Sequence, residues 1–133
     1  VDNTSYTFPA GTFTQAVTVT HTPLTDNATP AAGSLLGIGH AYQVSAIDDV
    51  TEESVEPSGS YTVTIGYTDA EVGAAIEDTL GLYQWDGAEW VEEPTSVVDT
   101  VANTVAATPN HFSTWAVLGE TRRVFLPLVL RRG

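Results

Sequence analysis

The 133-residue sequence contains no cysteine, no methionine and no lysine. Without cysteine no disulfide framework can form, so cysteine usage says nothing about the redox compartment. No apolar stretch reaches the roughly 18 to 20 residues that cross a bilayer, and the apolar run at residues 124–130 is far shorter. We therefore expect no membrane span and one domain that is long enough to bury a core.

Positive charge is confined to one end of the chain. The formal net charge is -13, every acidic residue precedes Arg122, and the only basic residues are Arg122, Arg123, Arg131 and Arg132. A purely acidic body repels nucleic acid and anionic lipid, because their phosphates require clustered Lys and Arg. We therefore expect no nucleic-acid partner.

Composition also indicates where the protein acts. Threonine is abundant, lysine is absent, and the sequence starts at Val1 without methionine, as after removal of a signal peptide. These features together predict an extracellular or cell-surface location.

Alternation of apolar and polar residues is the clearest structural signal. It predicts strands over residues 13–20, 42–46 and 61–67, with one apolar face each. The residues on those faces are Phe13, Gln15, Val17, Val19, Tyr42, Val44, Ala46, Tyr61, Val63, Ile65 and Tyr67. Residues 22–39 and 48–59 are rich in turn-forming or acidic residues and are predicted as surface loops. Within residues 69–79 we predict a short helical turn capped by Asp69.

A hairpin is predicted at residues 80–91. Asp86 and Gly87 suit the positive φ angles of a tight turn between two apolar strands. Further strands are predicted at residues 96–99, 104–107, 113–118 and 124–130. The fold class is therefore all-β: an immunoglobulin-like antiparallel β-sandwich with an apolar C-terminal strand.

The sequence contains no residue spacing typical of a metal or cofactor site. His21, His40 and His111 are far apart and lack the spacing of zinc ligands. The acidic residues at 48–53 lack the glycine-punctuated spacing of a calcium loop and indicate a solvated acidic loop instead. We predict no metal and no cofactor.

An aromatic platform for sugar is one alternative function. Tyr83, Trp85 and Trp90 lie on the predicted hairpin, and stacking on a sugar requires flat apolar faces that are exposed. Cross-strand aromatic pairs are also ordinary sheet stabilisers, so a carbohydrate-binding module is an alternative and glycan binding is not the expected main function.

Self-cleavage is a second alternative. In the tripeptide His111, Phe112 and Ser113, the serine hydroxyl could attack the carbonyl of Phe112 while the histidine removes its proton. This reaction requires strain at the Phe112–Ser113 bond.

Three motifs carry a resemblance to a known family. They are Tyr-Thr-Phe-Pro-Ala-Gly at residues 6–11, Leu-Tyr-Gln-Trp-Asp-Gly at residues 82–87, and His-Phe-Ser-Thr-Trp-Ala-Val at residues 111–117. Over most of residues 6–118 the chain resembles the β-sandwich modules of bacterial surface proteins similar to the zonula-occludens/netrin-receptor (ZU-type) domain. Autoproteolytic relatives of that family cleave after the residue that follows a histidine, which by resemblance places cleavage between Phe112 and Ser113. Many members keep the fold without cleaving.

The run at residues 124–130, called here the terminal segment, is apolar on both faces. Val124, Leu126, Leu128 and Leu130 point one way, and Phe125 and Val129 point the other way. Pro127 lacks an N–H and suits an edge strand. A segment covered on both faces must pair with a sheet, either in its own copy or in a neighbour.

We accordingly predict a β-sandwich over residues 1–121 and a terminal strand over residues 122–133 that completes its own or a neighbouring sandwich. Opposite charge would steer the four arginines onto an acidic surface. The predicted function is a non-enzymatic extracellular structural or assembly module, such as a filament or surface-layer subunit joined by strand addition. The expected partners are other copies of the chain or other surface proteins.

Overall fold

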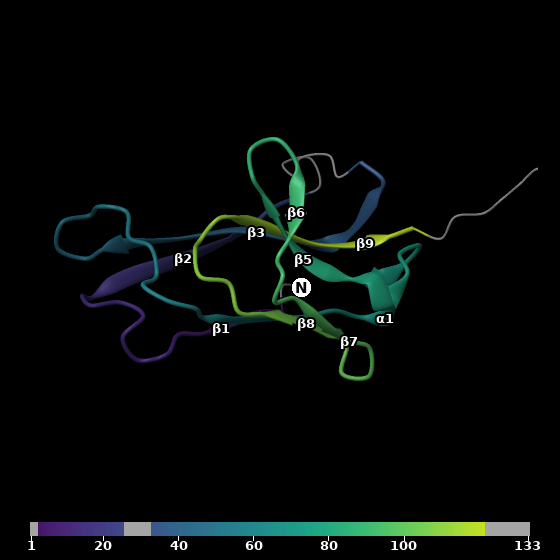
Figure 1. Ribbon diagram of the computed structural model, residues 1–133, viewed down its shortest axis with the longest axis horizontal. Helices are drawn as coiled ribbons and strands as arrows, with labels where there is room; N and C mark the ends of the chain where they lie inside the picture. Colours follow the sequence, from purple (N-terminus) through teal and green to yellow (C-terminus); the bar gives the residue numbers. More distant parts are fainter. Residues whose placement is uncertain (1–2, 26–32, 122–133) are drawn as a thin grey trace, which may run out of the picture.

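Two antiparallel sheets packed face to face make up the molecule (Figure 1). The computed structural model describes residues 3–25 and 33–121. Apart from two short helical turns, all regular structure in these residues is strand. The predicted all-β sandwich is confirmed, while the predicted strand at residues 124–130 lies outside the described residues.

The four-stranded sheet has β1 and β7 at its two edges. All of its pairs are antiparallel. In spatial order its strands are β1 (Asn3–Thr7), β4 (Thr62–Gly66), β8 (Thr104–Ala107) and β7 (Val97–Asp99).

The five-stranded sheet has β2 and β6 at its edges, and it also pairs only antiparallel strands. Its hairpin β5–β6 confirms the turn predicted at Asp86 and Gly87, where Gly87 has a φ of 101°. In spatial order its strands are β2 (Val17–Pro23), β3 (Leu35–Asp48), β9 (Thr114–Glu120), β5 (Gly81–Trp85) and β6 (Trp90–Glu92).

The core lies between the sheets and follows the predicted alternation. In β4 and its flanks the residues Tyr61, Val63, Ile65 and Tyr67 are buried, while the threonines between them are half-buried. Trp115 is fully buried on the inner face of β9. Removal of this apolar surface from water stabilises the contact between the two sheets.

Two strand boundaries differ from the prediction. Phe13 and Gln15 precede β2, because the chain turns at Gly11 and crosses from one sheet to the other before the ladder begins. The predicted loop at residues 22–39 is wrong at both ends, since β2 continues to Pro23 and β3 begins at Leu35. Proline is tolerated because β2 is an edge strand, and Gly39, with a φ of 90°, lies in a shift of register in β3.

The predicted helical turn exists as α1 (Asp69–Val72), and a 3-10 turn, η2 (Glu77–Thr79), follows it. The predicted cap at Asp69 is wrong. The Thr68 hydroxyl accepts the N–H of Glu71, and the Glu71 carboxylate accepts the N–H of Thr68, which is a capping box. Within residues 3–25 and 33–121, no helix is long and apolar enough to cross a membrane.

Candidate functional site

The tripeptide His111, Phe112 and Ser113 lies in the connection before β9. Its side chains point to different neighbours. The His111 ring contacts the amide oxygen of Asn110 at 3.1 Å and packs against the Trp115 ring at a centroid distance of 5.3 Å. The Ser113 hydroxyl accepts a hydrogen bond from the Gln84 side chain at 3.4 Å.

Backbone hydrogen bonds hold the same tripeptide in place. The Tyr61 hydroxyl donates to the carbonyl of His111 at 3.0 Å, and burial raises the pKa of this hydroxyl so that it remains a donor. The N–H of Phe112 donates to the Glu56 carboxylate at 2.9 Å. Among the described residues no hydrogen bond joins the His111 ring to the Ser113 hydroxyl. Self-cleavage stays a prediction.

The tryptophans of the β5–β6 hairpin face each other across the turn. Trp85 pairs with Trp90 in the ladder, and their ring centroids are 5.4 Å apart. Both belong to a second apolar cluster on the outer face of the five-stranded sheet, together with Ala116 and Leu118 of β9. Trp90 is only 9% exposed, so at most one of the two rings presents a broad surface to solvent.

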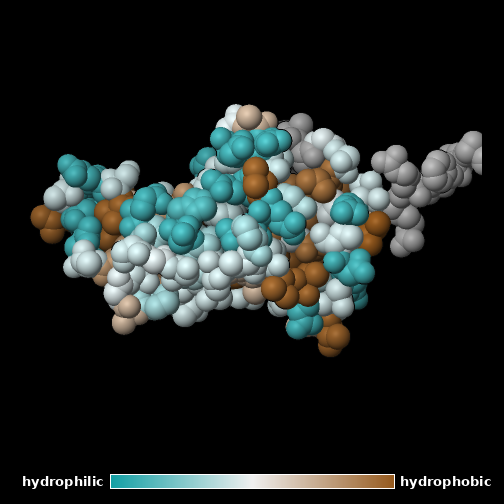
Figure 2. Space-filling view, viewed as in Figure 1, coloured by the Kyte–Doolittle hydropathy of each residue, from teal (hydrophilic) through white to brown (hydrophobic). Residues whose placement is uncertain are grey.

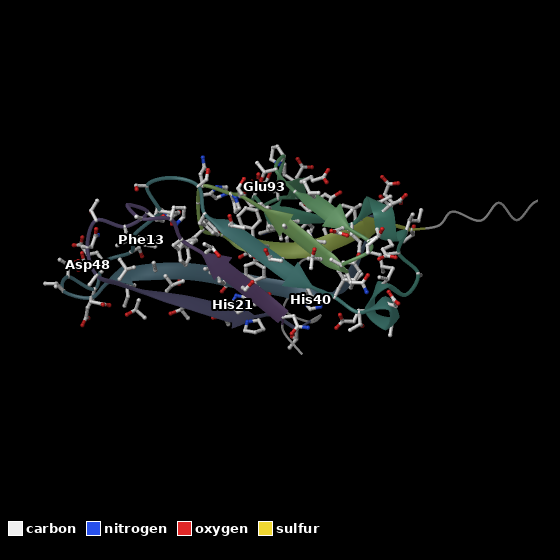
Figure 3. The ribbon with its side chains drawn as sticks, turned by 90° about the horizontal axis from the view of Figure 1, so that it is seen from below. Phe13, His21, His40, Asp48 and Glu93 are labelled. Carbon is white, nitrogen blue, oxygen red and sulfur yellow. The ribbon has the colours of Figure 1, made fainter. Side chains whose placement is uncertain are left out.

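The sandwich has two long sides where edge strands of the two sheets face each other. One is formed by β1 and β2 and is called here the β1/β2 side, and the other is formed by β6 and β7. In Figure 3 His21 and His40 lie along the β1/β2 side with Asp48 near one end, whereas Glu93 lies on the opposite side.

Apolar side chains are incompletely covered on the β1/β2 side. Seven apolar residues pack against the core while remaining only half-buried, and five of them come from β1, β2 and the connection between these strands. These five are Tyr6, Phe8, Phe13, Val17 and Val19. The described part of the sandwich therefore leaves its core least protected between its two N-terminal edge strands.

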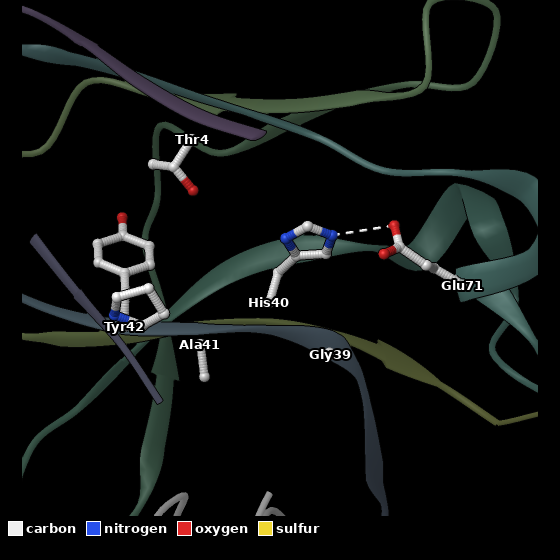
Figure 4. A pocket seen from close by; sticks show the side chains of 7 residues that line it. Thr4, Gly39, His40, Ala41, Tyr42 and Glu71 are labelled. Carbon is white, nitrogen blue, oxygen red and sulfur yellow. Dashed lines mark hydrogen bonds and ion pairs between the residues drawn. The ribbon is translucent and has the colours of Figure 1, made fainter. Parts of the chain in front are cut away.

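Polar pairs occupy the remainder of this side. The Tyr6 hydroxyl contacts Nδ1 of His21 at 2.6 Å. His40, only 6% exposed, holds the Glu71 carboxylate through its Nε2 at 3.0 Å, as Figure 4 shows. This hydrogen bond lowers the pKa of the Glu71 carboxyl. A cavity of about 210 Å³ surrounds the pair and is lined by Thr4, Pro23, Gly39, His40, Ala41, Tyr42 and Glu71.

Carboxylates lie beyond both ends of β2. At the end where β2 begins, Asp49 accepts the Thr18 hydroxyl, and Asp48 accepts the N–H groups of Val50 and Thr51. The hydrogen bonds from Thr51 and Val50 lower the pKa of Asp48, which keeps it ionised. At the other end Glu71 lines the same cavity as Pro23. The β2 edge is therefore bracketed by negative charge.

The side formed by β6 and β7 is closed differently. Residues 93–96 cross from one sheet to the other and bond to β5, because Glu93 donates its N–H to the Leu82 carbonyl and the Ser96 hydroxyl accepts the Leu82 N–H. Figure 2 shows hydrophobic atoms over β7 and the turn after it. There Val97 is 65% exposed and Val101 is 96% exposed, but both point away from the core.

Only some of the predicted site residues lie within the described part of the chain. It places His111, Phe112 and Ser113 together without a catalytic hydrogen bond, while the arginines and the terminal segment lie outside the described residues. Sequence reasoning placed Phe13, Val17 and Val19 on an apolar strand face but did not identify the β1/β2 side, because β1 is short and mostly polar. Tyr6 and Phe8 entered the sequence analysis only through a motif.

Among the described residues, no group of three or more His, Asp or Glu side chains is placed to hold a metal ion. Comparison of the chain with family models, with curated proteins and with solved structures gives no match.

Proposed function

We propose that this chain is a non-enzymatic structural module of an extracellular assembly, and that its terminal segment joins it to a neighbouring molecule by strand addition. One observation carries the proposal. The described sandwich contains no Lys or Arg and has open sheet edges, whereas all four arginines of the chain flank a segment that is apolar on both faces. The terminal segment supplies the positive charge that the sandwich lacks, and the sheet edges supply backbone groups with which the segment can pair.

Physical chemistry favours pairing over solvation of this segment. An apolar strand in water exposes its side chains and gains nothing from its backbone groups, while an added strand buries the side chains and forms ladder bonds. Each ladder bond contributes about 1 kcal/mol net. Arginines at both ends of the segment also favour an acidic partner over a basic one and accelerate the encounter at low ionic strength.

Sedimentation velocity on the full chain tests the proposal. The intact chain should form species larger than the 14.1 kDa monomer, and their share should rise with protein concentration. The double variant Leu126→Glu, Leu128→Glu should remain monomeric, because two carboxylates cannot be buried in a sheet interface. Val101→Glu, on a fully exposed turn, is the matched control and should assemble like the intact chain. An intact chain that stays monomeric, or a double variant that assembles normally, contradicts the proposal.

The two alternative functions, self-cleavage and carbohydrate binding, can each be tested by a simple experiment. Denaturing mass spectrometry of the intact chain would reveal cleavage between Phe112 and Ser113 as two fragments in place of one mass. Titration with glycans would change the fluorescence of Trp85 if the hairpin binds sugar. Neither alternative draws a supporting contact from the described residues.

A further inference from the structure

We infer that the edge of β2 that faces away from β3 is the acceptor for strand addition, and that the strand it accepts is the terminal segment of a second copy of this chain. The inference rests on the proposed function and adds the surface and the source of the strand. Four features support it: the backbone groups at the edge of β2, the half-buried apolar residues beside it, the charges at its ends and the reach of the chain.

The backbone of β2 has hydrogen-bonding groups to offer. Leu24 donates its N–H to Ala41, and Asp49 donates its N–H to Ala16, which fixes the alternation of the β2–β3 ladder. Even-numbered residues of β2 bond to β3, so the N–H and C=O groups of Val17 and Val19 point to the open side. Over seven residues, β2 matches the length of the terminal segment.

The side chains at this edge need the cover that an added strand provides. A strand placed beside β2 has one face over the gap between the sheets, where Tyr6, Phe8, Phe13, Val17 and Val19 are half-buried. Four apolar residues of the terminal segment share one face and would lie against them. Threonines 18, 20 and 22 form the exposed face of β2, next to the other face of the segment.

The charges agree at both ends. The terminal segment carries an arginine pair before it and another after it, and β2 has Asp48 and Asp49 at one end and Glu71 at the other. Either strand direction therefore brings arginines to carboxylates. The edge of β7 lacks this match, because it is three residues long and its half-buried core contact is the single residue Val98.

The reach of the chain excludes full pairing within one copy. Tyr42 lies between Pro23 and Trp115 in the sheet, so the residue of β9 level with the end of β2 is Trp115. From there to Glu120 is a rise of about 17 Å, and a strand beside β2 lies three strand spacings, about 14 Å, from β9. The path from Glu120 to residue 124 spans at most about 14 Å. Pairing of the terminal segment along the full length of β2 therefore requires a donor from another molecule.

Donation from one copy to the next uses two different surfaces of each molecule. Such a head-to-tail contact does not close unless the rotation between copies forms a ring, and otherwise it extends as a filament. The proposed assembly is thus a chain in which every sandwich is completed by its neighbour.

A pair of matched variants of the full chain tests the acceptor. Val19 and Val98 are both half-buried, both pack against the same core and both lie in edge strands. In Val19→Lys the dissociation constant for assembly should rise at least tenfold, because an inward-facing lysine on an edge blocks strand addition. In Val98→Lys it should change less than twofold. Thermal unfolding of each variant verifies that the sandwich is intact.

Charge reversal provides a second measurement if Val19→Lys does not fold. Asp49→Lys should weaken assembly severalfold, whereas Glu89→Lys, on the exposed hairpin, should not. Weakening by Val98→Lys or Glu89→Lys alone would place the acceptor elsewhere and overturn this inference. So would full assembly of Val19→Lys or Asp49→Lys. In both cases loss of assembly in Leu126→Glu, Leu128→Glu would leave the proposed function standing, while normal assembly of that variant would overturn both.

Discussion

The two long sides of this sandwich cover the core to different extents. The side between β6 and β7 is sealed by residues 93–96, which hydrogen-bond to β5 while they cross between the sheets. On the β1/β2 side residues 8–16 also cross between the sheets, but five apolar side chains stay half-buried there. Among the described residues the core is therefore less completely covered on the β1/β2 side than on the other.

The difference is instructive because exposed apolar residues occur on both sides. Val97 and Val101 are among the most exposed apolar residues that the structure describes, yet they lie on and after β7 and leave no core residue exposed. The half-buried residues of the β1/β2 side are less conspicuous but form one continuous cluster with the core. Incomplete burial of a core marks an interface better than isolated exposure does.

The largest contrast should appear when matched valines are truncated. Val105 is fully buried in β8 beside the sealed side, and Val105→Ala should lower the free energy of unfolding by about 2 to 3 kcal/mol. Val19→Ala should cost about half as much, because Val19 is only half-buried in the monomer. Urea unfolding at a concentration that keeps the chain monomeric measures both. Equal losses would mean that the β1/β2 side is as well covered as the other.

A smaller, pH-dependent effect is expected at Glu71. Its carboxylate closes the capping box of α1 and accepts a hydrogen bond from His40, so Glu71→Gln should cost about 1 kcal/mol near neutral pH. The hydrogen bond from His40 lowers the pKa of Glu71 below its ordinary value of 4.5. The stabilisation is therefore complete above that value and is lost as the pH falls through the lowered pKa.

Urea unfolding of both proteins across this acidic range measures the effect. The difference between the parent chain and Glu71→Gln should shrink as the pH decreases below the ordinary value. A difference that stays constant down to strongly acidic pH would show that the ionised carboxylate contributes nothing.

The smallest effect is expected on the sealed side. Val101→Ser should change the free energy of unfolding by less than about 0.5 kcal/mol, since the side chain is 96% exposed. It should also leave the sedimentation profile unchanged. A marked loss of assembly in this variant would transfer the interface to the side of β7.

Sequence patterns predicted strands well wherever one face is buried. Alternation identified β4 and β3, because strands with one buried face alternate apolar and polar residues. The Asp86–Gly87 turn identified the β5–β6 hairpin, because these residue types favour the positive φ of a tight turn. The pattern misplaced the start of β2, where Phe13 continues the alternation but belongs to the crossing between sheets. It missed β1, whose residues are mostly polar because only one face of this edge strand meets the core.

The candidate interface was less predictable than the fold. The apolar terminal segment and its arginines are evident in the sequence, and they suggest a donor without an acceptor. The acceptor depends on which edges lie side by side, and that is decided by pairings between residues distant in the sequence, such as Tyr6 with Val63 and His21 with Val44. Local patterns hold no information about such neighbours.

Disulfide trapping between two copies tests directly whether β2 accepts the terminal segment, since the chain has no cysteine to interfere. A Thr20→Cys variant is mixed with a Phe125→Cys or Val129→Cys variant under mild oxidation, with Val97→Cys as the control acceptor on β7. We expect a mixed disulfide between Thr20→Cys and at least one donor variant, seen as a dimer mass without reductant, and none with Val97→Cys. Trapping at Val97→Cys in its place, or no mixed disulfide from an assembled sample, would contradict strand addition at β2.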